Sequence, residues 1–185
     1  GIPSDVERHI NISKSVRFIA TINNDASTER LSPRLIDRVP VISLNHNSEF
    51  KSNLLKTIDF DGAINNESLE SCFDVNLYES SFTTEEENSL EQIIEILRTP
   101  INRTTSIRVS QRKYNAIKRY CHVANEIEGL RVQPLDFAIN QHILPLIEGY
   151  GSGFKERLHN LEQKLVELDL NISKATLKNI INNGN

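Results

Sequence analysis

Two asparagines and two arginines near the start of the chain have the types and spacing that could contact a ligand. The apolar run over residues 16–22 predicts a buried strand, and Asn23 and Asn24 come directly after it. Ligands of open α/β sheets lie beyond the carboxyl ends of strands, so either asparagine is well placed to touch one. Arg34 and Arg38 are four residues apart, and a guanidinium binds phosphate oxygens in a fork.

The elements that must position these residues are also signalled locally. Ser32 suits a helix N-cap, Pro33 suits the first turn, and Leu35–Ile36 supplies an apolar face. Arg34 and Arg38 would then share one face of this helix, with Asp37 able to pair with either arginine. Residues 39–44 predict a second strand that returns to the sheet.

The order FIATINND…LSPRLIDR resembles the second half of an AAA+ ATPase core, closest to the McrB-like and MoxR-like branches. The resemblance implies that Asn23 is the sensor 1 residue that helps to place the attacking water, with Asn24 as the alternative. It implies that Arg38 is the arginine finger that reaches the nucleotide of a neighbouring subunit, with Arg34 as a second arginine. The competing interpretation is structural, because arginines on a short helix are usually solvated or salt-bridged.

A second resemblance lies in residues 107–147. Ser110 suits the N-cap of an amphipathic helix, and Gln133-Pro134 begins another. The apolar positions of the two helices are Tyr114, Ile117, Cys121 and Ala124, then Leu135, Ile139 and Ile143. The stretch looks like the helical lid of MoxR-like AAA+ proteins, in which a Ser-x-Arg supplies sensor 2. Arg112 matches that arginine, which implies contact with the γ-phosphate and coupling of nucleotide state to lid angle; the alternative is an ordinary helix-start arginine, slightly unfavourable against the helix dipole.

The phosphate cradle and the metal carboxylates of that family are missing from the sequence. There is no G-x-x-x-x-G-K-[ST] motif and no strand ending in Asp-Glu, so Walker A and Walker B are absent. The glycine-rich run over residues 149–153 has the wrong spacing and follows a helix, so it predicts a flexible joint. Both motifs precede sensor 1 in this family, and residues 1–15 are too few to hold them. We therefore expect a fragment of a longer ATPase, inactive alone: ATP or GTP and Mg²⁺ would bind in the full-length protein, and this fragment would bind none and offer no metal site.

Charge is unevenly distributed along a chain of net charge −4. Residues 57–97 contain eleven acids and no Lys or Arg, whereas residues 98–125 contain seven Lys or Arg and no acid. Acidic and basic surfaces side by side are compatible with two interpretations: self-association around a ring, or a solvated face, which suits the acidic half at least as well. Isolated cysteines and the lack of a signal peptide or a long apolar run predict a cytoplasmic protein without a membrane partner.

The basic run raises a rival function, nucleic-acid binding by the helix over residues 108–120. Its cations are Arg108, Arg112, Lys113, Lys118 and Arg119, and Tyr114 and Tyr120 could stack on bases. Tyr114 falls on the apolar face, however, and the acidic pI argues against strong nonspecific binding.

The remaining helices are predicted from caps and periodicity. Residues 84–87, Thr-Glu-Glu-Glu, are a capping-box signature, and Ser173 suits the N-cap of a last helix. Between them runs a heptad-like seam of Phe154, Leu158, Leu161, Leu165 and Leu168.

The sequence thus predicts a mainly α chain with a partial α/β portion. Residues 1–44 would be the C-terminal portion of an AAA+ α/β core, 45–83 an acidic insertion, 84–147 a helical lid and 148–185 a C-terminal helical extension. The implied function is to contribute sensors and an arginine finger to ATP or GTP hydrolysis at the subunit interfaces of a ring oligomer. The parent would be a McrB-like, restriction or DNA-linked, or a MoxR-like remodelling ATPase, with nucleic acid or protein as its substrate. The alternative is a non-catalytic helical interaction or nucleic-acid-binding module that uses the basic 108–120 helix.

Overall fold

The computed structural model describes residues 12, 16, 18–22, 31–43, 82–102, 104, 106–126, 133–149 and 151–183. The chain divides into two compact units, Gly1–Arg30 with Ser52–Asp74 and Leu31–Lys51 with Val75–Asn185. All helices of the described residues belong to the second unit, which we call the helical unit. The residues predicted as lid and as helical extension therefore lie in one compact unit, together with the helix of residues 33–36.

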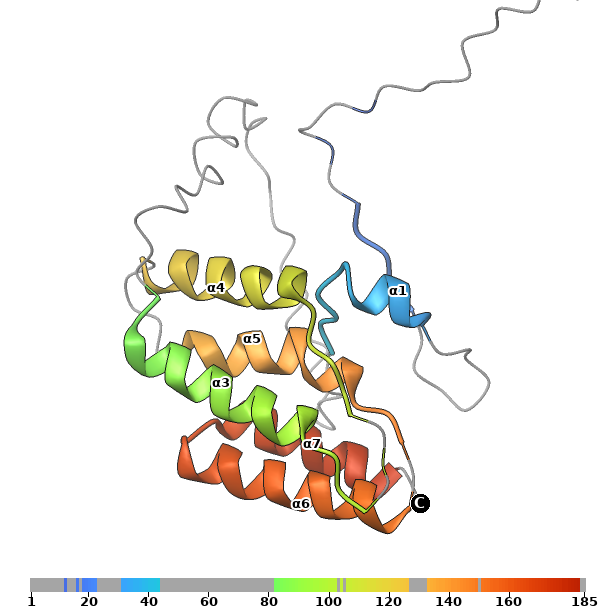
Figure 1. Cartoon of the computed structure of the whole chain (residues 1–185). Coiled ribbons are helices and arrows are strands. Elements are labelled where there is room, and N and C mark those ends of the chain that lie inside the picture. Colours follow the sequence, from blue (N-terminus) through green and yellow to red (C-terminus); the bar gives the residue numbers. More distant parts are fainter. Residues whose placement is uncertain are drawn as a thin grey trace, which may run out of the picture. The chain divides into compact units, whose positions relative to one another are not determined.

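The helical unit is built from six α-helices and one 3-10 turn among the described residues, and none of these residues forms a strand (Figure 1). The elements are α1 (Pro33–Ile36), α3 (Thr84–Arg98), α4 (Gln111–Asn125), α5 (Pro134–His142), η2 (Leu144–Leu146), α6 (Ser152–Glu167) and α7 (Asn171–Asn183). Helix α5 packs between α4 and α7, while α6 packs between α7 and α3. The mainly helical class predicted from the sequence is confirmed for this part of the chain.

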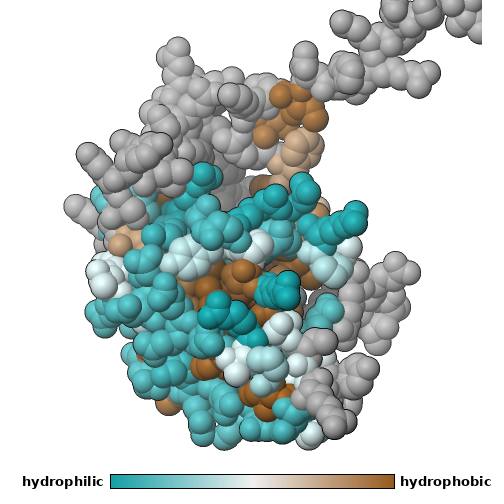
Figure 2. All heavy atoms as spheres, in the orientation of Figure 1, coloured by the Kyte–Doolittle hydropathy of each residue, from teal (hydrophilic) through white to brown (hydrophobic). Residues whose placement is uncertain are grey.

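One apolar core joins these helices. Amphipathic spacing puts Leu90, Ile93 and Leu97 of α3 completely out of solvent. The other helices contribute Ile117, Cys121, Leu135, Ala138, Ile139, Ile143, Leu144, Ile147, Leu158, Leu161, Leu165, Leu170 and Leu177. The face seen in Figure 2 is hydrophilic over most of the helical unit, with apolar patches between the polar side chains.

Most helix starts follow their local signals, with one displaced by a residue. The capping box of α3 is formed by Thr83 rather than Thr84: Thr83 N donates to Glu86 Oε2 over 2.8 Å, and Glu86 N donates to Thr83 Oγ1 over 3.1 Å. Ser110 caps α4 as predicted, since its Oγ accepts from Lys113 N. Pro134 occupies the first turn of α5, also as predicted.

The start of α7 corrects one prediction. Ser173 does not cap this helix, because α7 begins at Asn171 and Ser173 lies inside its first turn. The cap comes instead from Asp136 of α5, whose Oδ2 and Oδ1 accept from Ile172 N and Ser173 N, each over 2.8 Å. Ser173 Oγ donates back to the Asp136 carbonyl over 2.8 Å. We call Asp136, Ile172 and Ser173 the α5–α7 junction.

The glycine-rich run predicted as a flexible joint has a packing role at the start of α6. Gly151, at φ 90°, precedes the first residue of the helix. A Cβ on Gly153 would stand 2.5 Å from the Ile101 carbonyl oxygen, so this glycine permits close approach of two backbones. Arg157, one turn further, is buried and donates to the Thr99 carbonyl over 3.0 Å, and burial lowers its pKa. Arg157 is not one of the apolar positions of the heptad-like seam, so periodicity does not predict its burial.

The two stretches predicted as strands form none in their described residues. Phe18 and Ile19 are 80% and 93% exposed, so burial on both faces of a sheet is wrong for them. Residues 39–43 follow α1 as non-helical chain, and Val41 N donates to the Gln141 carbonyl at the end of α5 over 3.0 Å. The physical reason is that a strand is stabilised by a ladder to a neighbouring strand, and the described residues supply no such neighbour. The acidic insertion predicted over 45–83 lies outside the described residues except for Phe82 and Thr83.

Candidate functional site

Helix α1 is a single turn that ends before the second predicted arginine. Ser32 Oγ accepts from Leu35 N over 3.3 Å and Pro33 occupies the first turn, so the predicted start is confirmed. The helix closes at Ile36, which is buried, and Asp37 is its C-cap. Arg34 and Arg38 are both exposed, but Arg38 lies beyond the helix end.

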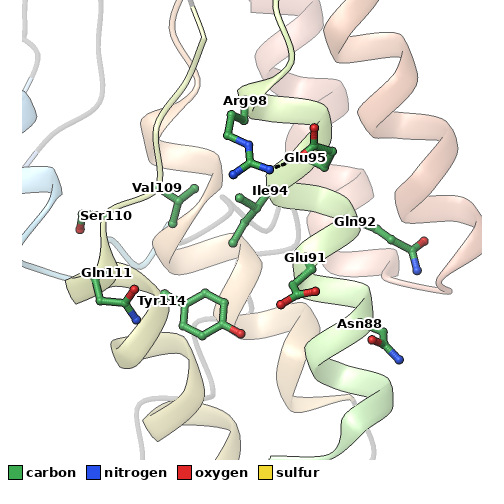
Figure 3. A pocket seen from close by; sticks show the side chains of 10 residues that line it. All are labelled: Asn88, Glu91, Gln92, Ile94, Glu95, Arg98, Val109, Ser110, Gln111 and Tyr114. Atoms are coloured by element: carbon green, nitrogen blue, oxygen red, sulfur yellow. Dashed lines mark hydrogen bonds and ion pairs between the residues drawn. The ribbon is translucent and has the colours of Figure 1, made fainter.

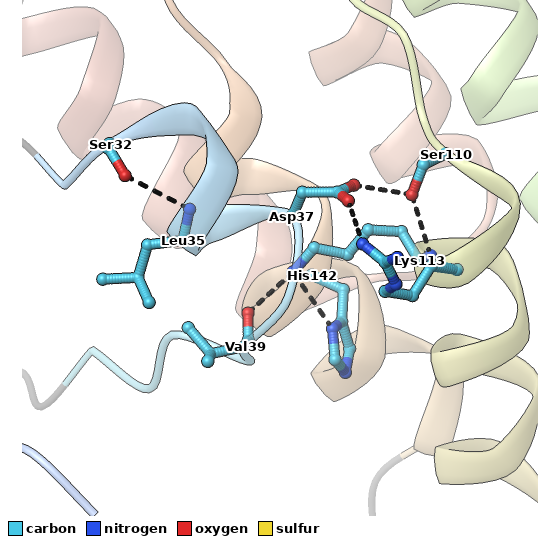
Figure 4. A network of polar contacts seen from close by, with 8 residues as sticks. Ser32, Leu35, Asp37, Val39, Ser110, Lys113 and His142 are labelled. Atoms are coloured by element: carbon cyan, nitrogen blue, oxygen red, sulfur yellow. Dashed lines mark hydrogen bonds and ion pairs between the residues drawn. The ribbon is translucent and has the colours of Figure 1, made fainter. Parts of the chain in front are cut away.

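Asp37 joins this turn to the start of α4 (Figure 4). Its Oδ1 accepts from Ser110 Oγ over 2.6 Å, and its Oδ2 accepts from Arg112 Nη1 over 2.9 Å. The two partners are 73 and 75 residues away in sequence. Asp37 therefore binds neither of the nearby arginines that sequence reasoning offered it, and we call this set the ionic contact.

A second contact beside it is buried. Lys113 is 1% exposed; its Nζ donates to the Val39 carbonyl over 2.7 Å and lies 3.5 Å from His142 Nδ1. Burial lowers the pKa of Lys113, and the Asp37 carboxylate opposes that shift. Burial, with the Lys113 charge second, lowers the pKa of His142 to about 4. His142 is therefore neutral at pH 7, and Nδ1 can accept from the ammonium group. We call this set the buried contact, and the two contacts together the α1 dock.

The predicted site residues differ in whether the structure describes them and in whether they are paired. Asn23 and Asn24 lie outside the described residues. Arg112 is in the first turn of α4, as predicted, and its guanidinium is held by Asp37. No ion pair of Arg34 or Arg38 is formed with the described part of the chain, and both face solvent. The fold thus brings Arg112 against the residue that precedes Arg38.

Sequence reasoning missed Lys113, His142 and the role of Asp37. One signal was available for Lys113, which is four residues before Ile117 and eight before Cys121 and so belongs to the buried face of α4. Lys113 was nevertheless counted among the exposed cations, because lysine is rarely buried without a partner. The carbonyl that satisfies it is 74 residues distant, and no local pattern reveals that.

The basic face proposed for nucleic acid has several of its groups engaged. Lys118 Nζ lies 3.1 Å from Glu87 Oε1 and 5.2 Å from the centre of the Phe82 ring. Tyr114 donates its hydroxyl to Glu87 over 2.9 Å, and burial, followed by Glu87, raises the pKa of Tyr114 to about 12. Lys113 is buried, so this face presents fewer cations to a ligand than its sequence suggests.

A hollow of about 650 Å³ lies between α3 and the start of α4 (Figure 3). Glu91 and Glu95 line it from α3, and Ser110 and Tyr114 line it from α4. Arg98 also lines it, but its guanidinium is paired with Glu95. The Arg98–Glu95 pair leaves the Glu91 carboxylate uncompensated, so the hollow is unfavourable for a phosphate.

Metal and thiol chemistry find no support in the described residues. No three His, Cys, Asp or Glu side chains among them gather as a metal site. Cys121 is buried, and that burial raises the pKa of its thiol to about 12, so it is not a reactive thiolate at neutral pH. Among the helices that the structure describes, none has the length and apolarity needed to cross a membrane.

Comparison with known proteins defines a family and no activity. Neither the curated proteins nor the solved structures include a match to this chain. A family model described as a domain of unknown function, DUF8727, matches residues 50–185. The match takes in α3 to α7 and leaves α1 outside it. Since it covers most of the chain, this protein belongs to the DUF8727 family.

Proposed function

We propose that the chain is the C-terminal part of an AAA+ NTPase of McrB-like or MoxR-like type, acting in ATP or GTP hydrolysis at the subunit interfaces of a ring oligomer. One observation carries the proposal. Parts of the two segments that bear the resemblance, residues 31–38 of the first and 110–112 of the second, meet in the helical unit through Asp37, Ser110 and Arg112. If both segments serve one nucleotide site, they must lie in contact. If their similarity to the family arose by chance, no contact between them is expected.

Each residue has a role that its chemistry suits. Asn23 would orient the attacking water, and Arg112 would contact the γ-phosphate bound to its own subunit. Arg38, exposed beyond the end of α1, would reach the nucleotide of the next subunit, with Arg34 beside it. A guanidinium stays charged and offers forked donors to phosphate oxygens as charge develops.

Mg²⁺ does not fit the described residues, which offer no carboxylate cluster to hold it. The roles proposed for this chain are therefore limited to positioning water and binding phosphate oxygens. A nucleotide site also needs a phosphate cradle, and neither Walker motif occurs in the sequence.

The test is NTP hydrolysis by this chain joined to its native upstream sequence. Arg38→Ala should lower kcat by about a thousandfold, the lower range for loss of an arginine finger. Asn23→Ala should also lower kcat, whereas Arg119→Ala, an exposed arginine of α4, is the matched control that should not. Unchanged turnover in both Arg38→Ala and Asn23→Ala overturns the proposal.

A mixing experiment tests action between subunits. If Arg38 acts on the neighbouring site and Asn23 on its own, mixed oligomers of the two inactive variants contain some complete sites. Mixing should therefore restore part of the turnover. Activity that stays absent, in oligomers shown to exchange subunits, contradicts the trans role of Arg38.

The alternative is a helical interaction or nucleic-acid-binding module that uses the 108–120 helix. Its exposed cations are Arg108, Arg112 and Arg119, of which Arg112 is paired with Asp37. The engaged state of Lys113, Lys118 and Tyr114 makes this the weaker proposal.

A further inference from the structure

The two contacts of the α1 dock differ in access to solvent. In the ionic contact the Arg112 side chain is 58% exposed and the Asp37 side chain 30%. In the buried contact Lys113 and His142 are 1% and 6% exposed. An anion from solution can therefore approach the Arg112 guanidinium, whereas the Lys113 ammonium group is closed to it.

We propose that Asp37 is a positioning residue for Arg112, and that the phosphate of a bound nucleotide takes the guanidinium from the Asp37 carboxylate. This inference rests on the proposed function and deepens it. It assigns Arg112 a resident counter-ion in its own chain, which nucleotide binding must displace.

The chemistry of the pair supports an exchange of this kind. Asp37 engages Arg112 through a single bond of 2.9 Å, and a guanidinium has five N–H donors. A terminal phosphate offers more negative charge and three oxygens, so it is the stronger partner for the same group. The Asp37 carboxylate opposes phosphate binding through like-charge repulsion, so nucleotide affinity measures the competition.

Loss of the Arg112 guanidinium to a phosphate would leave Asp37 with the Ser110 bond alone in the ionic contact. The Lys113 bond to the Val39 carbonyl and the Val41 N–H bond to the Gln141 carbonyl are untouched by a ligand at Arg112. Helix α1 would then turn about residues 39–41 rather than detach. Arg38 follows Asp37 directly, so the same turn changes the direction of the proposed trans arginine. Nucleotide sensed by Arg112 would in this way reach the neighbouring subunit's site.

The experiment measures the Kd of ATP, in the absence of hydrolysis, for the chain joined to its native upstream sequence. Asp37→Asn should tighten ATP binding about fivefold, the scale expected for losing one exposed competing ion pair. Asp37→Glu should return the affinity toward the wild-type value. Glu126→Gln, at the exposed far end of α4, removes the same charge and should leave the Kd unchanged.

A double-mutant cycle separates competition from a structural effect. The gain from Asp37→Asn should vanish in the Arg112→Ala background, because no guanidinium is left to release. Asp37→Ala removes the same carboxylate, should also tighten binding about fivefold, and serves if Asp37→Asn fails to fold.

The outcomes distinguish the two proposals. If Arg112→Ala weakens ATP binding while Asp37→Asn leaves it unchanged or weakens it, the displacement of Asp37 is overturned and the proposed function stands. A gain that persists in the Arg112→Ala background also overturns the displacement. If no variant, wild type included, binds or hydrolyses nucleotide, the proposed function itself is overturned, and this inference with it.

Discussion

Two aspartates, Asp37 and Asp136, each lie at the start of a helix to which they do not belong. Asp136 reaches the first turn of α7, and Asp37 reaches Ser110 and Arg112 at the start of α4. Both carboxylates therefore lie at the positive end of a helix dipole, where an anion is stabilised. The two carboxylates share this position at a helix start, but they differ in their hydrogen-bond donors and in their exposure to solvent.

The donors and the solvent make the difference. Asp136 is 2% exposed and accepts from two backbone N–H groups that are fixed by the helix. Asp37 is partly exposed and accepts from two side chains that can rotate toward other partners. The same residue type therefore holds two helices together permanently in one place and makes an exchangeable contact in the other.

The largest expected effect is the difference in stability between a variant without the Asp136 carboxylate and one without the Asp37 carboxylate. Asp136→Ala should lower the free energy of unfolding by about 3 kcal/mol, because the buried Ser173 N–H and the part-buried Ile172 N–H both lose their acceptors. Asp37→Ala should cost less than about 1 kcal/mol, as for other partly exposed ion pairs. Urea unfolding of the 185-residue chain, followed by circular dichroism at pH 7, measures both. Equal costs for the two variants would show that the ionic contact is as structural as the α5–α7 junction.

The pH dependence of the free energy of unfolding tests the buried contact of the α1 dock through His142. The folded pKa of His142 is about 4, below its ordinary 6.5, so the unfolded chain binds more protons between those values. Stability should therefore fall as pH drops below about 6.5, by about 2 kcal/mol at pH 5. The charged groups that face His142 are Lys113 of α4 and, beyond it, Asp37.

His142→Gln is the control for that series. Carboxylates titrate in both proteins, so the difference between the two unfolding profiles isolates the imidazole. Parallel profiles for wild type and His142→Gln between pH 7 and 5 would contradict the depressed pKa.

The smallest effect concerns salt. Raising NaCl to 1 M shortens the Debye length to about 3 Å, which screens exposed charges and leaves buried ones nearly unaffected. The cost of Asp37→Ala should then approach zero, while the cost of Asp136→Ala persists. Urea unfolding at low and high salt measures both costs, and a penalty for Asp37→Ala that survives in 1 M NaCl would count against an exchangeable contact.

Local signals predicted most of the helical unit. Ser32, Ser110 and Pro134 mark helix starts through bonds or dihedral preferences that span a few residues, and those starts are where the sequence indicated. Thr83 took the capping role expected of Thr84, because consecutive threonines give equivalent local signals. Apolar periodicity likewise predicted the buried positions of α3, α4 and α6.

The contacts that lock the unit could not be predicted, because their partners are distant in sequence. Asp136 and Ser173 are 37 residues apart, and Asp37 and Arg112 are 75 apart. Arg157 is buried and its Nη2 donates to the Thr99 carbonyl 58 residues away, so its burial could not be predicted for the same reason. The apolar run of residues 16–22 shows the opposite error, since its composition suits a sheet that the described residues do not contain.

The site was predicted in part. The sequence placed Arg112 correctly in the first turn of a helix, but it placed Arg34 and Arg38 on one helix face, whereas Arg38 lies beyond the end of α1. Helix spacing predicted that Asp37 could pair with Arg34 or Arg38, because a sequence reveals only the geometry within one helix. The bond to Arg112, from another helix, could not be predicted in this way. The roles of Asn23, Arg38 and Arg112 in hydrolysis stay predictions.

The Lys113 bond also decides where this domain can be cut for expression. The family match begins at residue 50, but the carbonyl that accepts from Lys113 belongs to Val39. A segment cloned from residue 50 would lack the carbonyl that accepts from the buried Lys113 ammonium group, with a loss of stability. Cloning from Leu31 retains α1 and its carbonyl, so the physical boundary of the domain precedes the one that sequence similarity draws.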